Sequence, residues 1–127
     1  MAVDITLARC FDEHPLPVMS LPYLEQWAVV HLIDAEREQL YCPLLHRLAR
    51  AEYGAADEVV YAPEHVGILK LEIEKVLGLL SMKKESDTFP VNRGPTTIGD
   101  VKAFLSSLLA VVEEAVRDGK GLFAWTD

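Results

Sequence analysis

The chain has 127 residues, half of them hydrophobic, and carries twenty acidic against twelve basic side chains, for a formal net charge of −8. This length and composition argue against disorder and collagen-like repeats, and they predict a single domain spanning residues 1–127. The acidity, together with the lack of a Lys/Arg-rich run, argues against nucleic acid and anionic membranes as ligands, since both need clustered cations.

The first third of the chain predicts a strand followed by a helix. Residues 3–7 alternate apolar and polar side chains, which is typical of a short strand with one buried face. Two prolines make residues 11–18 a predicted turn-rich stretch. Ser20 is then a candidate N-cap for a helix that runs from about Leu21 into the thirties, where apolar residues recur at helical spacing.

The middle of the chain predicts two more helices with a strand between them. Pro43 is placed in the first turn of a helix that we expect to end at Gly54. Residues 58–62 read as a short strand. Residues 63–81 predict a helix, although the alternation within residues 68–73 also fits a strand.

The last third predicts a long loop, a helix and a strand. Residues 83–97 contain two prolines and are expected to form the longest loop. Thr97 and Asp100 resemble a capping box at the start of a helix over residues 98–118, and Gly119 suits its C-terminus. A closing strand follows at residues 121–125.

These elements predict an α+β fold in which about four helices pack on a small sheet. The sheet is expected to contain the N-terminal strand, the central strand (58–62) and the C-terminal strand (121–125). An all-α bundle with extended ends is the alternative. The order of the strands does not follow from the sequence.

The two cysteines are too few for a disulfide framework, and the N-terminus lacks the basic and apolar segments of a secretory signal. We therefore expect a cytoplasmic protein. Cys10 with His14, and Cys42 with His46, share one spacing and together offer the ligand types of a tetrahedral zinc site. Structural zinc sites more often contain a Cys-x-x-Cys pair, so we predict no bound metal and no cofactor.

Two further patterns contain residue types that could serve in catalysis. His31, Asp34 and Glu38 would share one face of a helix, as ligands or as an acid–base set, but no matching Glu-x-x-His motif supplies a second helix. Ser81 and Lys84 satisfy a Ser-x-x-Lys motif without its companion motifs, and Ser81 is expected to end a helix rather than begin one. A metal-dependent enzyme built from these Cys, His and carboxylate groups is therefore only the second alternative.

The acidic residues are unevenly distributed along the chain. Residues 1–64 hold eleven Asp/Glu against four Arg, a balance of −7, whereas residues 65–127 hold nine against eight Lys/Arg, a balance of −1. Aromatic residues are interleaved with these acids, a combination that suits a basic protein partner. The predicted partner-binding residues are Tyr23, Glu25, Asp34, Glu36, Glu38, Tyr41, Glu52, Asp57 and Glu58. The competing interpretation places Trp27 and most tyrosines in the core.

We accordingly predict a small acidic cytosolic domain that neutralises or escorts a basic protein, as an immunity protein or antitoxin does for a cationic toxin. This hypothesis requires the carboxylates before residue 65 to gather on one surface. The alternative is a homo-oligomeric structural or adaptor domain, in which the apolar faces of helices 63–81 and 98–118 close on a second copy to form a homodimer.

Overall fold

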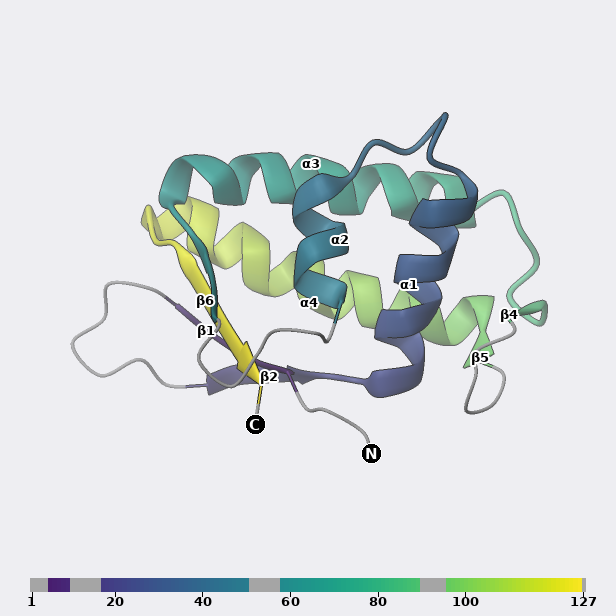
Figure 1. The fold of residues 1–127 in the computed structure, drawn as a ribbon, viewed down its shortest axis with the longest axis horizontal. Helices are drawn as coiled ribbons and strands as arrows, with labels where there is room; N and C mark the ends of the chain where they lie inside the picture. Colours follow the sequence, from purple (N-terminus) through teal and green to yellow (C-terminus); the bar gives the residue numbers. More distant parts are fainter. Residues whose placement is uncertain (1–4, 10–16, 51–57, 90–95, 127) are drawn as a thin grey trace.

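The computed structural model describes residues 5–9, 17–50, 58–89 and 96–126, which form an α+β arrangement of four helices and six strands (Figure 1). The predicted fold class is confirmed. In chain order the elements are β1 (Ile5–Arg9), β2 (Pro17–Leu21), α1 (Tyr23–Ala35), α2 (Pro43–Ala49), β3 (Glu58–Tyr61), α3 (Pro63–Leu80), β4 (Thr88–Phe89), β5 (Thr96–Thr97), α4 (Ile98–Asp118) and β6 (Leu122–Thr126).

The main sheet has the strand order β2-β1-β6-β3, and each neighbouring pair is antiparallel. The three predicted strands therefore do form one sheet, with β2 added at its edge. The two ends of the chain, β1 and β6, pair with each other at its centre. Side chains alternate between its faces as the pleat requires: Val59 and Tyr61 are buried, whereas Val60 between them is exposed.

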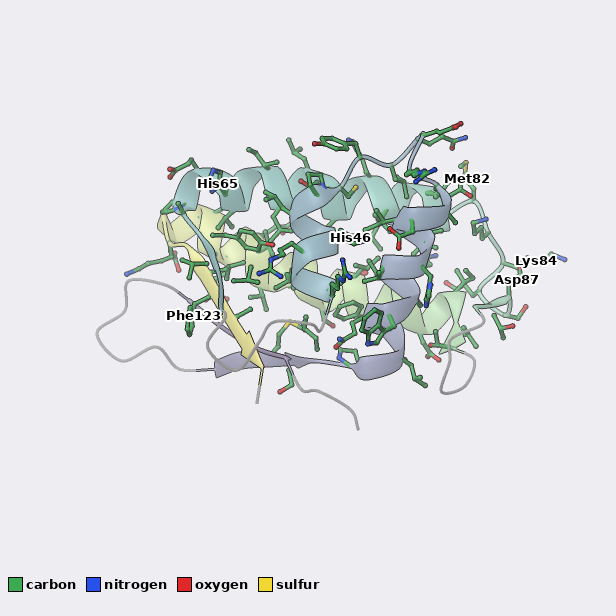
Figure 2. All side chains as sticks on the ribbon, in the orientation of Figure 1. His46, His65, Met82, Lys84, Asp87 and Phe123 are labelled. Atoms are coloured by element: carbon green, nitrogen blue, oxygen red, sulfur yellow. The ribbon has the colours of Figure 1, made fainter. Side chains whose placement is uncertain are left out.

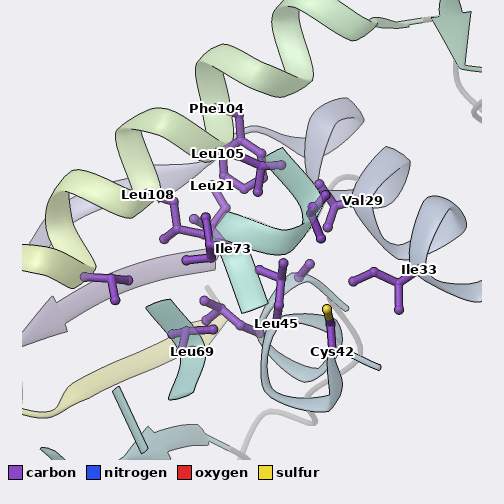
Figure 3. Packing of buried hydrophobic residues seen from close by; sticks show 14 of the residues in the cluster. Leu21, Val29, Ile33, Cys42, Leu45, Leu69, Ile73, Phe104, Leu105 and Leu108 are labelled. Atoms are coloured by element: carbon purple, nitrogen blue, oxygen red, sulfur yellow. The ribbon is translucent and has the colours of Figure 1, made fainter. Parts of the chain in front are cut away.

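The helices pack in two pairs over the sheet. Helices α3 and α4 lie along each other, and α1 and α2 cover them in the view of Figure 1. His65 lies in the first turn of α3, and Met82 lies just beyond its last residue (Figure 2). All four helices contribute to one apolar core, in which side chains of α1, α2, α3 and α4 meet (Figure 3). The residues of these helices that Figure 3 labels are Val29, Ile33, Leu45, Leu69, Ile73, Phe104, Leu105 and Leu108.

Several local predictions are confirmed at the later helices. The Thr97 side chain accepts a hydrogen bond from the Asp100 amide at 3.1 Å and caps α4. Gly119 ends α4 with a φ of 66°, a left-handed conformation in which glycine carries no side-chain penalty. Lys70 and Glu74, four residues apart on the exposed side of α3, form an ion pair at 3.6 Å.

Other boundaries are corrected by the structure. Ser20 does not cap α1, because it pairs with Thr6 in the ladder between β1 and β2; Pro22 occupies the N-cap position. Helix α2 ends at Ala49 rather than at Gly54, since Arg50 turns to an extended conformation. The predicted loop of residues 83–97 contains a small antiparallel pair, β4 with β5. No helix among the described residues has the length and apolarity needed to cross a membrane.

Candidate functional site

Three large apolar side chains are exposed around one hollow of about 420 Å³. Tyr41 is 78% exposed, Ile68 49% and Leu71 61%. Tyr41 belongs to the connection between α1 and α2, and the other two belong to α3. The hollow, called the α3 hollow below, is lined by Tyr41, Pro43, Leu44, His65, Ile68, Leu71, Glu72 and Lys75. Exposed apolar side chains that converge in this way are typical of interaction sites, unlike apolar residues scattered singly.

The pattern of α3 explains why these residues share a surface. Ile68, Leu71 and Lys75 follow one another at spacings of three and four residues, so they form a stripe along the helix. This stripe is separate from the buried one, which includes Leu69 and Ile73. The opposite wall of the hollow is made by the α1–α2 connection and the start of α2.

Glu72 links the two walls of the hollow. This side chain is only 4% exposed, and its Oε1 accepts hydrogen bonds from the amides of Leu44 and Leu45, both at 3.0 Å. These amides lie in the first turn of α2, where N–H groups lack partners within the helix. The Glu72 carboxylate from α3 therefore caps α2 at the positive end of its dipole.

Burial changes the acidity of Glu72 and of the neighbouring cysteine. Burial raises the pKa of Glu72, whereas the two amide hydrogen bonds and the charge of Lys75 lower it. Burial also raises the pKa of the Cys42 thiol, as does the Glu72 charge to a smaller extent. Cys42 Sγ lies 3.8 Å from the backbone oxygen of Glu72. A buried thiol with a raised pKa is a poor nucleophile, so these groups suit binding better than covalent catalysis.

Two of the four residues that offered zinc-ligand types, Cys42 and His46, have other partners in the structure. His46 Nε2 lies 2.9 Å from Asp34 Oδ1, joining α2 to α1, whereas Cys42 contacts Glu72 on α3 (Figure 2 labels His46). Cys10 and His14 lie outside the described residues. In residues 5–9, 17–50, 58–89 and 96–126 no group of three or more His, Cys, Asp or Glu could hold a metal ion.

The predicted face of His31, Asp34 and Glu38 does not form on one helix. Helix α1 ends at Ala35, so Glu38 lies in the turn that follows. Ser81 is the C-cap of α3 and its hydroxyl donates to the Gly78 carbonyl at 2.7 Å, which confirms that it ends the helix.

A larger hollow of about 780 Å³ lies between the end of α1 and the segment that follows α3. Its lining mixes both signs of charge: His31, Glu36, Lys83 and Asp87 stand over the buried Ile98. Glu36 thus shares a hollow with a lysine from the second half of the chain. The negative field at the end of α1 is therefore weaker than the sequence asymmetry alone indicates.

The structure brings only some of the predicted partner-binding residues together. Asp34, Glu36, Glu38 and Tyr41 lie at the end of α1 and in the connection to α2. Glu25 lies nearer the start of α1, about 13 Å from Asp34 along the helix axis. Its carboxylate accepts a hydrogen bond from the Thr96 hydroxyl at 3.2 Å. Tyr23 begins α1 and Glu58 begins β3, and the structure describes only their backbones; Glu52 and Asp57 lie outside the described residues.

Sequence reasoning missed Ile68, Leu71 and Glu72 as site residues. A signal for them was present, because the run Leu-Lys-Leu-Glu-Ile at residues 69–73 places apolar residues on more sides of α3 than a one-sided helix needs. The role of Glu72 had no local signal. Comparisons of this chain with protein-family models, with curated proteins and with solved structures give no match.

Proposed function

We propose that this chain is a protein-binding domain whose partner docks on the α3 hollow and on the adjoining α1–α2 connection. The convergence of Tyr41, Ile68 and Leu71 on one hollow is the observation that carries this proposal. Large exposed aromatic and aliphatic side chains are costly to leave in water, and they supply most of the binding energy when a partner covers them.

The charge of the chain favours a basic partner. Its net charge is −8, and Asp34, Glu36 and Glu38 lie at the end of α1 and in the connection that also carries Tyr41. Carboxylates beside apolar anchors accelerate association with a cationic protein while the anchors hold it. This combination fits an immunity-like or antitoxin-like protein that neutralises a basic toxin. The free buried thiol of Cys42 is in keeping with a cytoplasmic location.

Binding to defined basic proteins, beginning with the products of genes next to this one, tests the proposal. We expect Leu71→Ser to weaken binding by about tenfold, which corresponds to roughly 1.4 kcal/mol. Val116→Ser is the matched control, since Val116 is also exposed but lies on α4 outside the hollow. Glu38→Lys should slow association, with the effect diminishing at high salt. Equal effects of the two serine substitutions would contradict docking at the hollow.

A second copy of the chain is the competing occupant of this surface. The apolar faces of α3 and α4 that the sequence offered for self-association are buried in the core of the chain itself. Self-association therefore depends on other residues, of which Ile68 and Leu71 are the exposed candidates on α3. Light scattering separates the two functions: a dimer that Leu71→Ser converts to a monomer would assign the hollow to a second copy.

A further inference from the structure

We propose that the α3 hollow receives one cationic side chain, arginine or lysine, of the basic protein partner, and that Glu72 is its counter-ion. This inference rests on the proposed function and specifies the chemistry of its central contact.

Only one of the two carboxylate oxygens of Glu72 accepts hydrogen bonds from the described residues. Both amide hydrogen bonds, from Leu44 and Leu45, end on Oε1. Oε2 accepts no hydrogen bond from the described residues, although Glu72 is 96% buried and lines the hollow. A buried carboxylate is strongly stabilised by a paired cation and costs free energy without one. The free oxygen therefore gives the hollow a preference for a cation.

The walls of the hollow match the rest of an arginine or lysine side chain. Tyr41 offers an aromatic ring, and Ile68 and Leu71 offer aliphatic surface. Aliphatic stems of cationic side chains pack against such surfaces, while the charged head group is attracted to an aromatic face and to a carboxylate. A volume of about 420 Å³ is ample for one side chain.

Lys75 and His65, which can carry positive charge, also line the hollow. Lys75 lies one turn after Glu72 and lowers its pKa, but the two form no ion pair among the described residues. His65 lines the other end of the hollow. An incoming cation therefore meets a resident ammonium group that repels it without occupying Oε2. Removal of the Lys75 charge is expected to strengthen binding.

The test uses the whole chain and small probes, so that it does not depend on the identity of the partner. Nα-acetyl-arginine amide and Nα-acetyl-lysine amide are titrated into labelled protein, with amide shifts followed by nuclear magnetic resonance. The uncharged analogue Nα-acetyl-citrulline amide is the control ligand. We expect dissociation constants on the order of millimolar for the cations, with shifts at Tyr41, Leu44 and Leu71, and binding at least about tenfold weaker for citrulline.

Variants separate the charge of Glu72 from its structural role. Glu72→Gln keeps an oxygen that caps α2 but removes the charge, and we expect cation binding to fall by at least about tenfold. Glu74→Gln makes the same change two residues away, outside the hollow, and should leave binding unchanged. Lys75→Ala should strengthen binding several-fold, so the inference stays testable if Glu72→Gln proves unstable.

The outcomes distinguish this inference from the proposed function. Equal binding of citrulline and arginine amides, or cation binding that survives Glu72→Gln, would overturn it while leaving a protein-docking surface possible. Spermidine binding more tightly than both amino acid amides would assign the hollow to a free polyamine and also overturn it. Failure of every basic protein to bind, with Glu72-dependent binding of the amides intact, would overturn the proposed function alone.

Discussion

Two polar side chains on the helices, Glu72 and Gln26, are buried, and they differ in how well their hydrogen-bonding groups are satisfied. Glu72 on α3 is 4% exposed and accepts hydrogen bonds from two amides of α2. Gln26 on α1 is fully buried, and neither polar atom of its amide group has a hydrogen-bond partner within the described part of the chain. A carboxylate is the harder group to bury, yet here it is the better satisfied of the two.

The difference shows what a helix terminus contributes to burial. The first turn of α2 supplies N–H donors that α2 itself cannot use, so the Glu72 carboxylate and the α2 amides satisfy one another. Gln26 is the fourth residue of α1, its backbone amide donates to the Pro22 carbonyl at 2.9 Å, and no other described group reaches its side-chain amide. Burial of a polar group is thus stabilising or costly according to the donors around it rather than according to its charge alone.

The largest expected effect comes from removing the acceptor at residue 72. Glu72→Ala leaves the Leu44 and Leu45 amides without a partner, and we expect the free energy of unfolding to fall by about 2–4 kcal/mol. Glu72→Gln keeps an acceptor and should cost about 1 kcal/mol or less. Urea denaturation measures both values. Equal losses would show that the charge, and not the capping of α2, makes Glu72 stabilising.

Replacing Gln26 is expected to change the free energy of unfolding in the opposite direction. Gln26→Leu replaces an unpaired amide by an apolar group of similar size, and we expect the free energy of unfolding to rise by about 1–2 kcal/mol. The same denaturation measurement checks it, with Gln39→Leu as a control because Gln39 is exposed. A loss of stability in the Gln26 variant would contradict the absence of a hydrogen-bond partner and remove the contrast with Glu72.

The features that the sequence predicted correctly are set by residues that lie close together along the chain. Thr97 caps α4 through an amide three residues away, and Gly119 ends the same helix, so both were visible as local patterns. The short strands predicted at residues 58–62 and 121–125 likewise match β3 and β6 to within one residue. Each of these signals is contained in a few consecutive residues.

The sequence could not predict features that depend on distant pairing. Strand β2 exists because Ser20 and its neighbours pair with β1, and that pairing overrides the helix start expected at Ser20. Glu72 caps a helix that begins almost thirty residues earlier, at a distance fixed only by the packing of α2 on α3. The candidate site was missed for the same reason, since its two walls come from segments that become neighbours only after folding.

The pH dependence of stability gives a smaller and more specific test of how Glu72 is buried. Burial raises its pKa in the folded state above the unfolded value, so between these two values the folded protein holds a proton that the unfolded chain has lost. The contribution of Glu72 is therefore fully present below the unfolded pKa and declines as pH rises through the folded pKa. The decline amounts to about 1.4 kcal/mol for each unit that separates the two values.

Comparison with Glu72→Gln isolates this effect from the other carboxylates. Urea denaturation of both proteins from about pH 4 to about pH 8 spans the range in which a raised carboxyl pKa falls. We expect the stability of the unmodified chain relative to Glu72→Gln to decrease with rising pH and then to level off. Cys42 does not interfere, because its raised pKa places its own titration at alkaline pH. A relative stability that instead increased with pH would mean that the hydrogen bonds from the α2 amides outweigh burial and keep the Glu72 carboxylate ionised.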